Sequence, residues 1–318
     1  MTTGNPFDVQ VREVGLRDGL QMLAHTMPTA DKVAWIQAEY AAGVREIEVT
    51  SLVPARIAPQ FADAEAVIAA AKALPGLTTI ALVPNLRGAQ RAFELQVDKL
   101  DFVVSVSRTH NLRNVRRERE ESLQDLARIA HARDAAGLRG TVTLAAGLST
   151  ALGCSLEGQI PVDEVRRCAA ALVAAGADEV GVADTVGYAH PDLVTEVFCA
   201  VLAETGDIPV WAHFHDTRGL GLANVKAALD VGVRTFDASL GGIGGCPYAP
   251  GATGNVATED LCFMLDALGL RTGIDLPALL ELRHRLADWL PGVALYGTLA
   301  RAALPTGWPN LAQRLASH

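Results

Sequence analysis

Two histidines in the segment Trp211–Asp216, which reads WAHFHD, are spaced for metal binding. Side chains two residues apart along a β-strand point to the same face, so His213 and His215 would project together. Imidazole nitrogens with a nearby carboxylate oxygen make a ligand set for a divalent ion such as Mg²⁺, Mn²⁺ or Zn²⁺. A single histidine is more often a structural residue, whereas this pair at the end of a predicted strand indicates a metal site.

A second polar pair, Arg17 and Asp18, lies in the segment EVGLRDGLQ at residues 13–21. Asp-Gly is a common turn pair, so an ordinary turn is one interpretation of this segment. The functional interpretation makes Asp18 an oxygen ligand of the metal and Arg17 a fixed donor to a developing oxyanion.

The segment 241–255, GGIGGCPYAPGATGN, combines glycines with a single cysteine. Glycine permits unusual backbone angles and close approach to a ligand, although a flexible surface loop is the alternative. Cys246 is predicted to lie at the catalytic face, where a thiol can serve as an acid or a nucleophile. Asn255 can add an amide oxygen to the metal shell. The other cysteines are interpreted as core residues: Cys154, Cys168, Cys199 and Cys262.

Three more polar residues stand at the ends of predicted strands. They are Glu48, Asn85 and Asp184. Helix capping is the alternative for each of them, most clearly for Asn85 and Asp184. Their shared position at strand ends favours a functional role for the set.

The composition restricts the class of protein. Half of the 318 residues are apolar, which provides for a large core and excludes intrinsic disorder. The formal net charge of −9 argues against nucleic-acid binding, because neutralising phosphates requires clustered Lys and Arg. Five scattered cysteines without a CxxC pair indicate a reducing compartment. We find no apolar signal region and no window of about 18 apolar residues, so we predict no membrane span and a cytoplasmic location.

Strand-like and helix-like segments alternate along the chain, at a spacing of roughly 30 residues per pair, the size of one βα unit. The predicted strands are Val9–Val14, Arg45–Val49, Thr78–Val83, Leu100–Val106, Gly140–Leu144, Asp178–Val182, Pro209–Phe214 and Arg234–Ser239. The predicted helices are Asp31–Ala42, Phe61–Ala73, Arg87–Gln96, Arg119–Ala136, Val162–Ala175, Asp192–Ala203, Leu220–Val231 and Thr258–Ala267. Four of them end in a closing glycine: Gly43, Gly137, Gly176 and Gly232.

Eight such units without a linker favour a closed (β/α)8 TIM barrel over residues 1–274, followed by a C-terminal helical extension, residues 275–318, packed on the barrel. An open doubly wound sheet is the alternative, but a GxGxxG turn after the first strand would then be expected, and none is present. In a barrel the ends of all strands meet at one face, so the polar residues above would gather there.

Several segments resemble the hydroxymethylglutaryl-CoA lyases, which belong to the metal-dependent barrel lyases and synthases that share the Arg-Asp motif of the first strand. The resemblance rests on EVGLRDGLQ, HFHD and GGCPYAPGATGNVATEDL, and extends through VPNL at 83–86, ALGCSLEG at 151–158 and DTVG at 184–187. The Cys-Pro-Tyr glycine loop is its most specific element, since the related synthases lack it. One departure is the segment 106–119, a predicted loop after the fourth strand, which is unusually basic and unlike that of the usual lyases.

The resemblance implies a set of roles. Asp18, His213, His215 and Asn255 would hold a divalent cation, Mg²⁺ or Mn²⁺. Arg17 would face the thioester carbonyl and stabilise the enolate oxyanion of acetyl-CoA when the carbon–carbon bond breaks and acetoacetate leaves. Cys246 is a candidate to protonate the enolate carbon, and Glu48 and Asp184 would belong to the polar set around the reacting centre. The general base is Asp18, His213 or a water on the metal.

Other functions stay open at this point. The same chemistry could act on another branched thioester, such as citramalyl-CoA or isohexenylglutaryl-CoA. A condensing synthase that joins acetyl-CoA to a 2-oxo acid is a second class, and a catalytically silent barrel is a third. The expected partners are a CoA thioester and a second copy of the chain in a homodimer, with neither nucleic acid nor membrane.

A group of arginines in the segment 106–119 provides a candidate substrate contact. It comprises Arg108, Arg113, Arg116, Arg117 and Arg119. We predict that Arg116 and Arg117, with Asn85, bind the substrate, where the arginines would meet CoA phosphates or a carboxylate. The alternative is a solvated helix start balanced by Glu118, Glu120 and Glu121.

Overall fold

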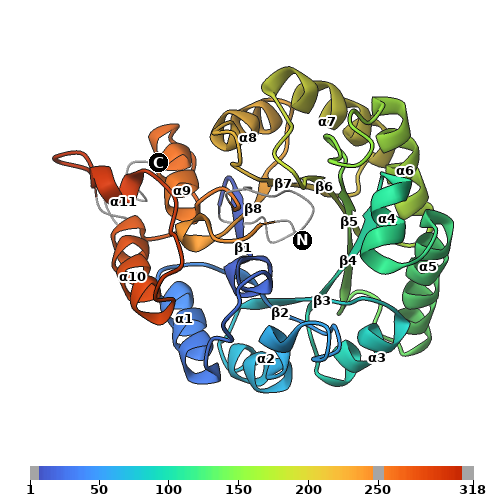
Figure 1. The fold of residues 1–318 in the computed structure, drawn as a ribbon, viewed down its shortest axis with the longest axis horizontal. Helices are drawn as coiled ribbons and strands as arrows, with labels where there is room; N and C mark the ends of the chain where they lie inside the picture. The colour runs from blue at the N-terminus through green and yellow to red at the C-terminus, as the bar shows by residue number, and fades with distance from the viewer. Residues whose placement is uncertain (1–6, 246–253, 310–318) are drawn as a thin grey trace.

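The computed structural model describes residues 7–245 and 254–309, which contain a closed barrel of eight parallel strands (Figure 1). The strands are β1 Gln10–Glu13, β2 Glu46–Ser51, β3 Thr78–Leu82, β4 Lys99–Ser105, β5 Thr143–Ser149, β6 Glu179–Asp184, β7 Val210–Phe214 and β8 Thr235–Ala238. They follow one another around the barrel, and β8 pairs with β1. The (β/α)8 barrel prediction is therefore confirmed, and the open sheet is excluded.

Helices form a ring outside the strands (Figure 1). They are α1 Thr29–Ala41, α2 Ala64–Lys72, α3 Leu86–Glu94, α4 Arg108–Val115, α5 Arg119–Ala135, α6 Val162–Ala174, α7 Pro191–Thr205, α8 Gly221–Asp230, α9 Thr258–Ala267, α10 Leu276–Trp289 and α11 Leu299–Ala302. Short helical turns lie at η1 Gly15–Gly19, η2 Pro59–Phe61 and η3 Leu240–Gly242. Within the described ranges, none of the helices combines the length and apolar character needed to cross a bilayer.

The four predicted closing glycines end their helices in the left-handed region. Gly43, Gly137, Gly176 and Gly232 all have positive φ angles, between 71° and 109°. Glycine adopts this conformation without the steric cost that other residues bear, which explains its place after the last helical turn. At Gly43 a Cβ atom would also lie 2.2 Å from the carbonyl oxygen of Gly273, so close backbone packing adds a second requirement.

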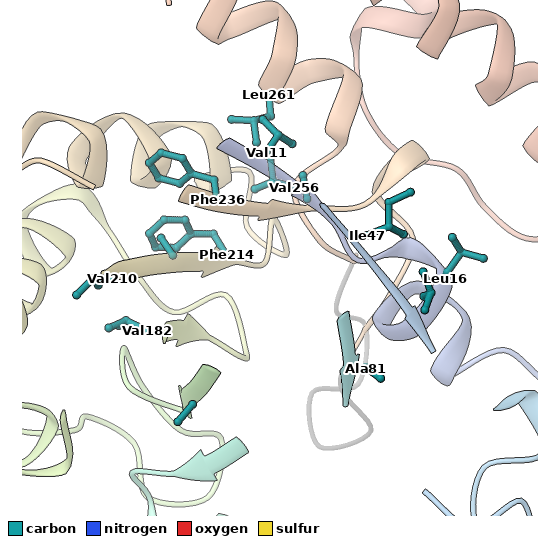
Figure 2. Close-up of a cluster of buried hydrophobic side chains, with 14 of the residues drawn as sticks. Val11, Leu16, Ile47, Ala81, Val182, Val210, Phe214, Phe236, Val256 and Leu261 are labelled. Carbon is teal, nitrogen blue, oxygen red and sulfur yellow. The ribbon is translucent and has the colours of Figure 1, made fainter. Parts of the chain in front are cut away.

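The hydrophobic core lies between the outer face of the barrel and the helices. Figure 2 shows Phe214 of β7 and Phe236 of β8 side by side within this layer. Phe198 of α7 packs against Phe214 with ring centroids 6.0 Å apart. Because every second residue of a strand faces outward, the alternating apolar residues of the predicted strands supply one side of this layer.

The barrel interior is more polar than its outer layer. Arg12 is buried and makes a cation–π contact with Trp211, its guanidinium carbon 4.7 Å from the ring centroid. Lys99 of β4 forms ion pairs with Glu46 of β2 and Glu179 of β6. These contacts cross the interior and fill it with charged pairs near the start of the strands.

Three local predictions are corrected by the structure. The predicted strand Gly140–Leu144 lies too early, because Gly140 has a positive φ angle of 83° and the strand β5 begins at Thr143. The basic segment 106–119, predicted as a loop, contains the helix α4, whose N-cap Ser107 accepts a hydrogen bond from the His110 backbone N–H. The first strand continues into a π-helical turn, Gly15–Gly19, instead of the ordinary turn that the Asp-Gly pair allowed.

The predicted C-terminal extension contains α10 and α11 within its described part. Asp275 N–H donates to the carbonyl oxygen of Ala42 at 2.7 Å, at the end of α1. Arg283 of α10 lies 2.7 Å from the buried Glu259 of α9, measured from Nε to Oε1. These bonds join α10 to helices at both ends of the barrel sequence, while the division into two units at residue 274 stays a prediction.

Candidate active site

The π-helical turn Gly15–Gly19 follows β1 at the mouth of the barrel and carries Arg17 and Asp18. Its conformation depends on two glycines, because a Cβ at Gly15 would lie 2.6 Å from Glu13 Oε1, and one at Gly19 would lie 2.7 Å from Ile243. π-Helical turns occur frequently at functional sites. The turn therefore places this arginine and carboxylate where the sequence motif predicted chemistry.

Asp18, His213 and His215 come together as a candidate metal site. Each offers one ligand atom, and the three atoms lie within 4.8 Å of one another. His215 Nε2 is 3.8 Å from Asp18 Oδ2, and the two imidazole centroids are 5.1 Å apart. The structure thus brings together the histidine pair of β7 and the carboxylate after β1, although they are about 200 residues apart in the sequence.

Asn255 completes this cluster from the segment before α9. Its Nδ2 donates to Asp18 Oδ2 at 2.7 Å and to the Ile243 carbonyl oxygen at 3.0 Å. Both donor bonds use the amide nitrogen, and the Oδ1 atom of this buried residue has no hydrogen-bond partner among the described residues. A buried amide oxygen in need of a partner beside a carboxylate and two imidazoles fits a divalent cation.

Arg17 is fixed by two carboxylates. Its Nη1 donates to Asp18 Oδ1 at 2.8 Å, and its Nε lies 2.7 Å from Glu48 Oε2. Burial alone would lower the pKa of Arg17, but the charges of Glu48 and Asp18 outweigh burial and raise it. The guanidinium is therefore charged and held in one place, as a donor to a developing oxyanion must be.

The pKa values of Glu48 and Asp18, the two carboxylates that contact Arg17, shift in opposite directions. Burial raises the pKa of Glu48 to about 8, because it outweighs the attraction of Arg17. Burial also acts to raise the pKa of Asp18, but Arg17 and the two histidines reverse this and lower it strongly. Asp18 is consequently the ionised carboxylate of the site, which suits a metal ligand.

Asp237 is a site residue that the sequence prediction missed. It lies on β8 and its Oδ2 is 3.1 Å from His213 Nδ1. Burial lowers the pKa of His213, but the hydrogen bond and charge of Asp237 outweigh it and raise the pKa. The sequence contained one indication of this role, because Asp237 lies on the predicted strand that follows the strand of His213 and neighbours it in a barrel.

Glu13 is a second residue without a predicted role. Its Oε1 accepts from the Gly15 and Leu240 backbone N–H groups at 2.8 Å and 3.0 Å. Its Oε2 accepts from Thr258 Oγ1 at 2.6 Å. The buried carboxylate thus ties the end of β1 to the segments after β8, including the start of α9.

Asp184 and Asn85 both hold backbone turns. Asp184 accepts from the Tyr188 and Ala189 N–H groups at 2.9 Å and 3.0 Å, so it organises the loop after β6. Asn85 is the N-cap of α3 and accepts from the Gly88 N–H at 3.0 Å. The capping alternative therefore describes Asn85 in this structure, and roles for these two residues in catalysis or substrate binding stay predictions.

The basic segment is largely neutralised by nearby carboxylates. Its ion pairs join Arg108 to Glu120, Arg117 to Asp125 and Arg119 to Glu164. Glu118 and Glu121 form the capping box of α5. Arg116 is exposed, ends α4 in the left-handed conformation and has no ion-pair partner within residues 7–245 and 254–309. Substrate binding by Arg116 and Arg117 stays a prediction.

The burial of the cysteines differs in part from the prediction. Cys246 lies outside the described residues, so its predicted role as the acid rests on the sequence. Cys154, Cys168 and Cys262 are buried, as expected for core residues. Cys199 of α7 is exposed, which corrects its assignment to the core.

A (β/α)8 barrel with a candidate metal site at the mouth of its strands defines the class of metal-dependent barrel enzymes, and comparison with known proteins identifies the family. The HMGL-like family model matches residues 8–285, and the chain belongs to this family. Hydroxymethylglutaryl-CoA lyase YngG of Bacillus subtilis is 40% identical over 285 residues, which cover 90% of this chain and 93% of that protein. The mitochondrial hydroxymethylglutaryl-CoA lyase of Mus musculus is 38% identical over 87% of this chain and 84% of its own.

Solved structures give the same result. An HMG-CoA lyase from Acinetobacter baumannii, in complex with coenzyme A and 3-methylmalate, has a TM-score of 0.88 and 37% identity. The match covers 97% of this chain and 99% of that one. Hydroxymethylglutaryl-CoA lyase from Pseudomonas aeruginosa has a TM-score of 0.87 and 35% identity, over 94% and 98% of the two chains.

Proposed function

We propose that this protein is a divalent-metal-dependent carbon–carbon lyase that cleaves 3-hydroxy-3-methylglutaryl-CoA to acetyl-CoA and acetoacetate. The observation that carries the proposal is the convergence of Asp18, His213 and His215 beside the fixed guanidinium of Arg17. Relatives named for this activity match the chain over nearly its whole length.

The metal would be held by Asp18, His213, His215 and Asn255. The partnerless Oδ1 of Asn255 and the mixed oxygen and nitrogen donor set support a divalent cation, Mg²⁺ or Mn²⁺. When bound, such a cation lowers the pKa of a coordinated hydroxyl and orients the substrate.

The chain's own residues supply the remaining steps. A general base takes the proton of the C3 hydroxyl as the bond between C2 and C3 breaks, and acetoacetate leaves. Arg17 donates hydrogen bonds to the thioester oxygen, where the negative charge of the enolate develops. Glu48 and Asp18 keep this guanidinium in place, so no reorganisation is required during the reaction. Cys246 then delivers a proton to the enolate carbon.

The substrate partner is proposed as a CoA thioester, in line with the coenzyme A bound by the similar lyase of Acinetobacter baumannii. The exposed Arg116, with Arg117, would contact the CoA phosphates. We further propose a cytoplasmic homodimer, on the family resemblance and on a Danio rerio relative named as cytoplasmic. A molar mass by light scattering equal to one chain would contradict the dimer.

The test is direct assay of the purified protein. With 3-hydroxy-3-methylglutaryl-CoA and Mg²⁺ or Mn²⁺ we expect acetyl-CoA and acetoacetate in equal amounts, and loss of turnover after treatment with EDTA. Asp18→Asn removes a ligand charge at nearly constant volume, and we expect kcat to fall at least 10²-fold. Asp288→Asn, the same exchange at an exposed position of α10, is the matched control and should retain full activity.

Two results would contradict the proposal. Release of acetyl-CoA only from another branched thioester, such as citramalyl-CoA, would refute the substrate but retain the lyase chemistry. Full activity of Asp18→Asn would refute the site.

A further inference from the structure

A row of polar side chains follows the inner wall of the barrel from β2 to β7 and ends at the candidate metal site. Arg12 of β1 is in register with both Glu46 of β2 and Asp237 of β8, and Asp237 is in register with His213 of β7. Residues in register on neighbouring parallel strands point to the same side of the sheet. The four side chains are therefore neighbours within one row.

The contact between Asp237 and His213 determines which ring nitrogen carries the proton. Asp237 Oδ2 lies 3.1 Å from His213 Nδ1. A carboxylate only accepts hydrogen bonds, so the proton of the neutral imidazole must be on Nδ1. The lone pair is then on Nε2, which is the nitrogen of His213 that remains available to an ion shared with Asp18 and His215.

The other oxygen of Asp237 is held from the opposite side. Arg12 Nε lies 3.3 Å from Asp237 Oδ1, and its guanidinium stacks on Trp211. Arg12 and Asp237 are both buried, at 1% and 7% exposure. Trp211 itself fits only because Gly181 has no side chain, since a Cβ there would lie 2.3 Å from the indole ring. The carboxylate is thus fixed by packing as well as by charge.

We propose that Asp237, held by Arg12, is a positioning residue that keeps His213 in the form protonated at Nδ1 and aims Nε2 into the metal site. This inference rests on the proposed function, because it takes His213 as a metal ligand. It assigns a purpose to a buried ion pair inside the barrel. Carboxylates that hold ligand histidines in this way typically contribute 10- to 100-fold to metal affinity.

The first test measures Mn²⁺ binding alone, without substrate, by the electron paramagnetic resonance signal of the free ion. We expect Asp237→Asn to raise the Kd for Mn²⁺ by about 10- to 100-fold. Asp125→Asn is the matched control, since Asp125 is also a buried carboxylate paired with an arginine, Arg117, but lies on α5 outside the barrel. It loses the same charge without removing the bond to His213, and its Kd should stay within about twofold of the unmodified value.

The second test reads the tautomer directly, by NMR of the metal-free protein with ¹⁵N-labelled histidine, where the His213→Gln variant identifies the signal of His213. We expect the Nδ1–H form in the unmodified protein at pH 8, and loss of that preference in Asp237→Asn. If Asp237→Asn does not fold, the His213 tautomer of the unmodified protein still tests the proposed role of Asp237.

An Nε2–H tautomer, or equal Mn²⁺ affinities of unmodified protein and Asp237→Asn, would overturn the role of Asp237. A lower melting temperature with unchanged Mn²⁺ affinity would also overturn it, since that is the result of a purely structural role. Absence of Mn²⁺ binding by the unmodified protein would instead refute the metal site and, with it, the proposed function.

Discussion

A buried pair of glutamates makes the stability of this protein depend on pH. Glu13 ends β1, Glu39 lies on α1, and both side chains are fully buried. Burial raises the pKa of Glu13 to about 7, against the hydrogen bonds that it accepts. Burial and the charge of Glu13 raise the pKa of Glu39 well above its ordinary value. Glu39 accepts a hydrogen bond from Trp35 Nε1 at 2.5 Å, whereas Glu13 accepts three that favour its charged form, so Glu39 is the partner that keeps the proton.

Glu39→Gln should therefore stabilise the protein at neutral pH. The amide can accept from Trp35 and donate towards Glu13 without taking up a proton. Above pH 4.5 the two glutamates of the unfolded chain are ionised, because their ordinary pKa is 4.5. The folded pair still binds at least one proton in this range, since burial raises both pKa values. Because both folded pKa values are raised, the stabilisation is complete below pH 4.5 and is lost as the pH rises towards 7. At about 1.4 kcal/mol per pH unit, the loss over this range is roughly 3 kcal/mol.

Urea unfolding followed by circular dichroism between pH 4.5 and pH 8 measures this difference. We expect nearly equal free energies of unfolding near pH 4.5, and an advantage of about 2–3 kcal/mol for Glu39→Gln at pH 7. Glu196→Gln, on the exposed side of α7, should follow the unmodified protein at every pH. The reasoning would be refuted by a difference that does not change with pH, or by a variant less stable than the unmodified chain at pH 7.

Two further variants test the predicted substrate and acid roles. Cys246→Ser should leave the Mn²⁺ affinity unchanged and lower kcat by about 10²-fold, which is the size expected for loss of a general acid. Cys199→Ser, at an exposed cysteine, is the control and should have no effect on kcat. An unchanged kcat for Cys246→Ser would exclude the thiol as the acid. Arg116→Ala should raise KM for the thioester about two- to fivefold, as expected for an exposed ion pair with a phosphate, and 0.5 M salt should reduce the difference. Arg139→Ala provides the control and should leave KM unchanged. Equal KM values for Arg116→Ala and the unmodified protein would refute substrate binding by Arg116 and favour the alternative, a solvated helix end.

The parts of the site that could be predicted from the sequence are those defined by short spacings. His213 and His215 are two residues apart, and Asp18 follows a strand within one motif, so period-two alternation and the common face of the strand ends were sufficient. The role of Asp237 depends on the register between β7 and β8, which no local pattern contains. The same holds for Glu13 and Glu39, which meet because α1 packs against the end of β1.

The errors in secondary structure have local physical causes. β5 reads Thr-Leu-Ala-Ala-Gly-Leu-Ser, and its alanines and Gly147 have low strand propensity, so the prediction placed the strand earlier. α4 is short and polar, without the apolar periodicity that predicts a helix, although Ser107 at its start is a favoured N-cap residue. Both elements become stable through their neighbours in the barrel rather than through their own sequence.

The net charge of −9 says little about the site, because the charges that matter are buried in pairs. Arg17 with Asp18 at the mouth of the barrel and Arg12 with Asp237 in its interior each place a guanidinium beside an ionised carboxylate. Removing one partner of such a pair leaves the other as an uncompensated buried charge, typically at a cost of about 3–5 kcal/mol. Alanine variants at these positions would therefore confuse loss of chemistry with loss of folding. Changes of equal size, such as Asp to Asn, keep the packing but still remove the charge, so the melting temperature of each variant has to be measured beside its activity.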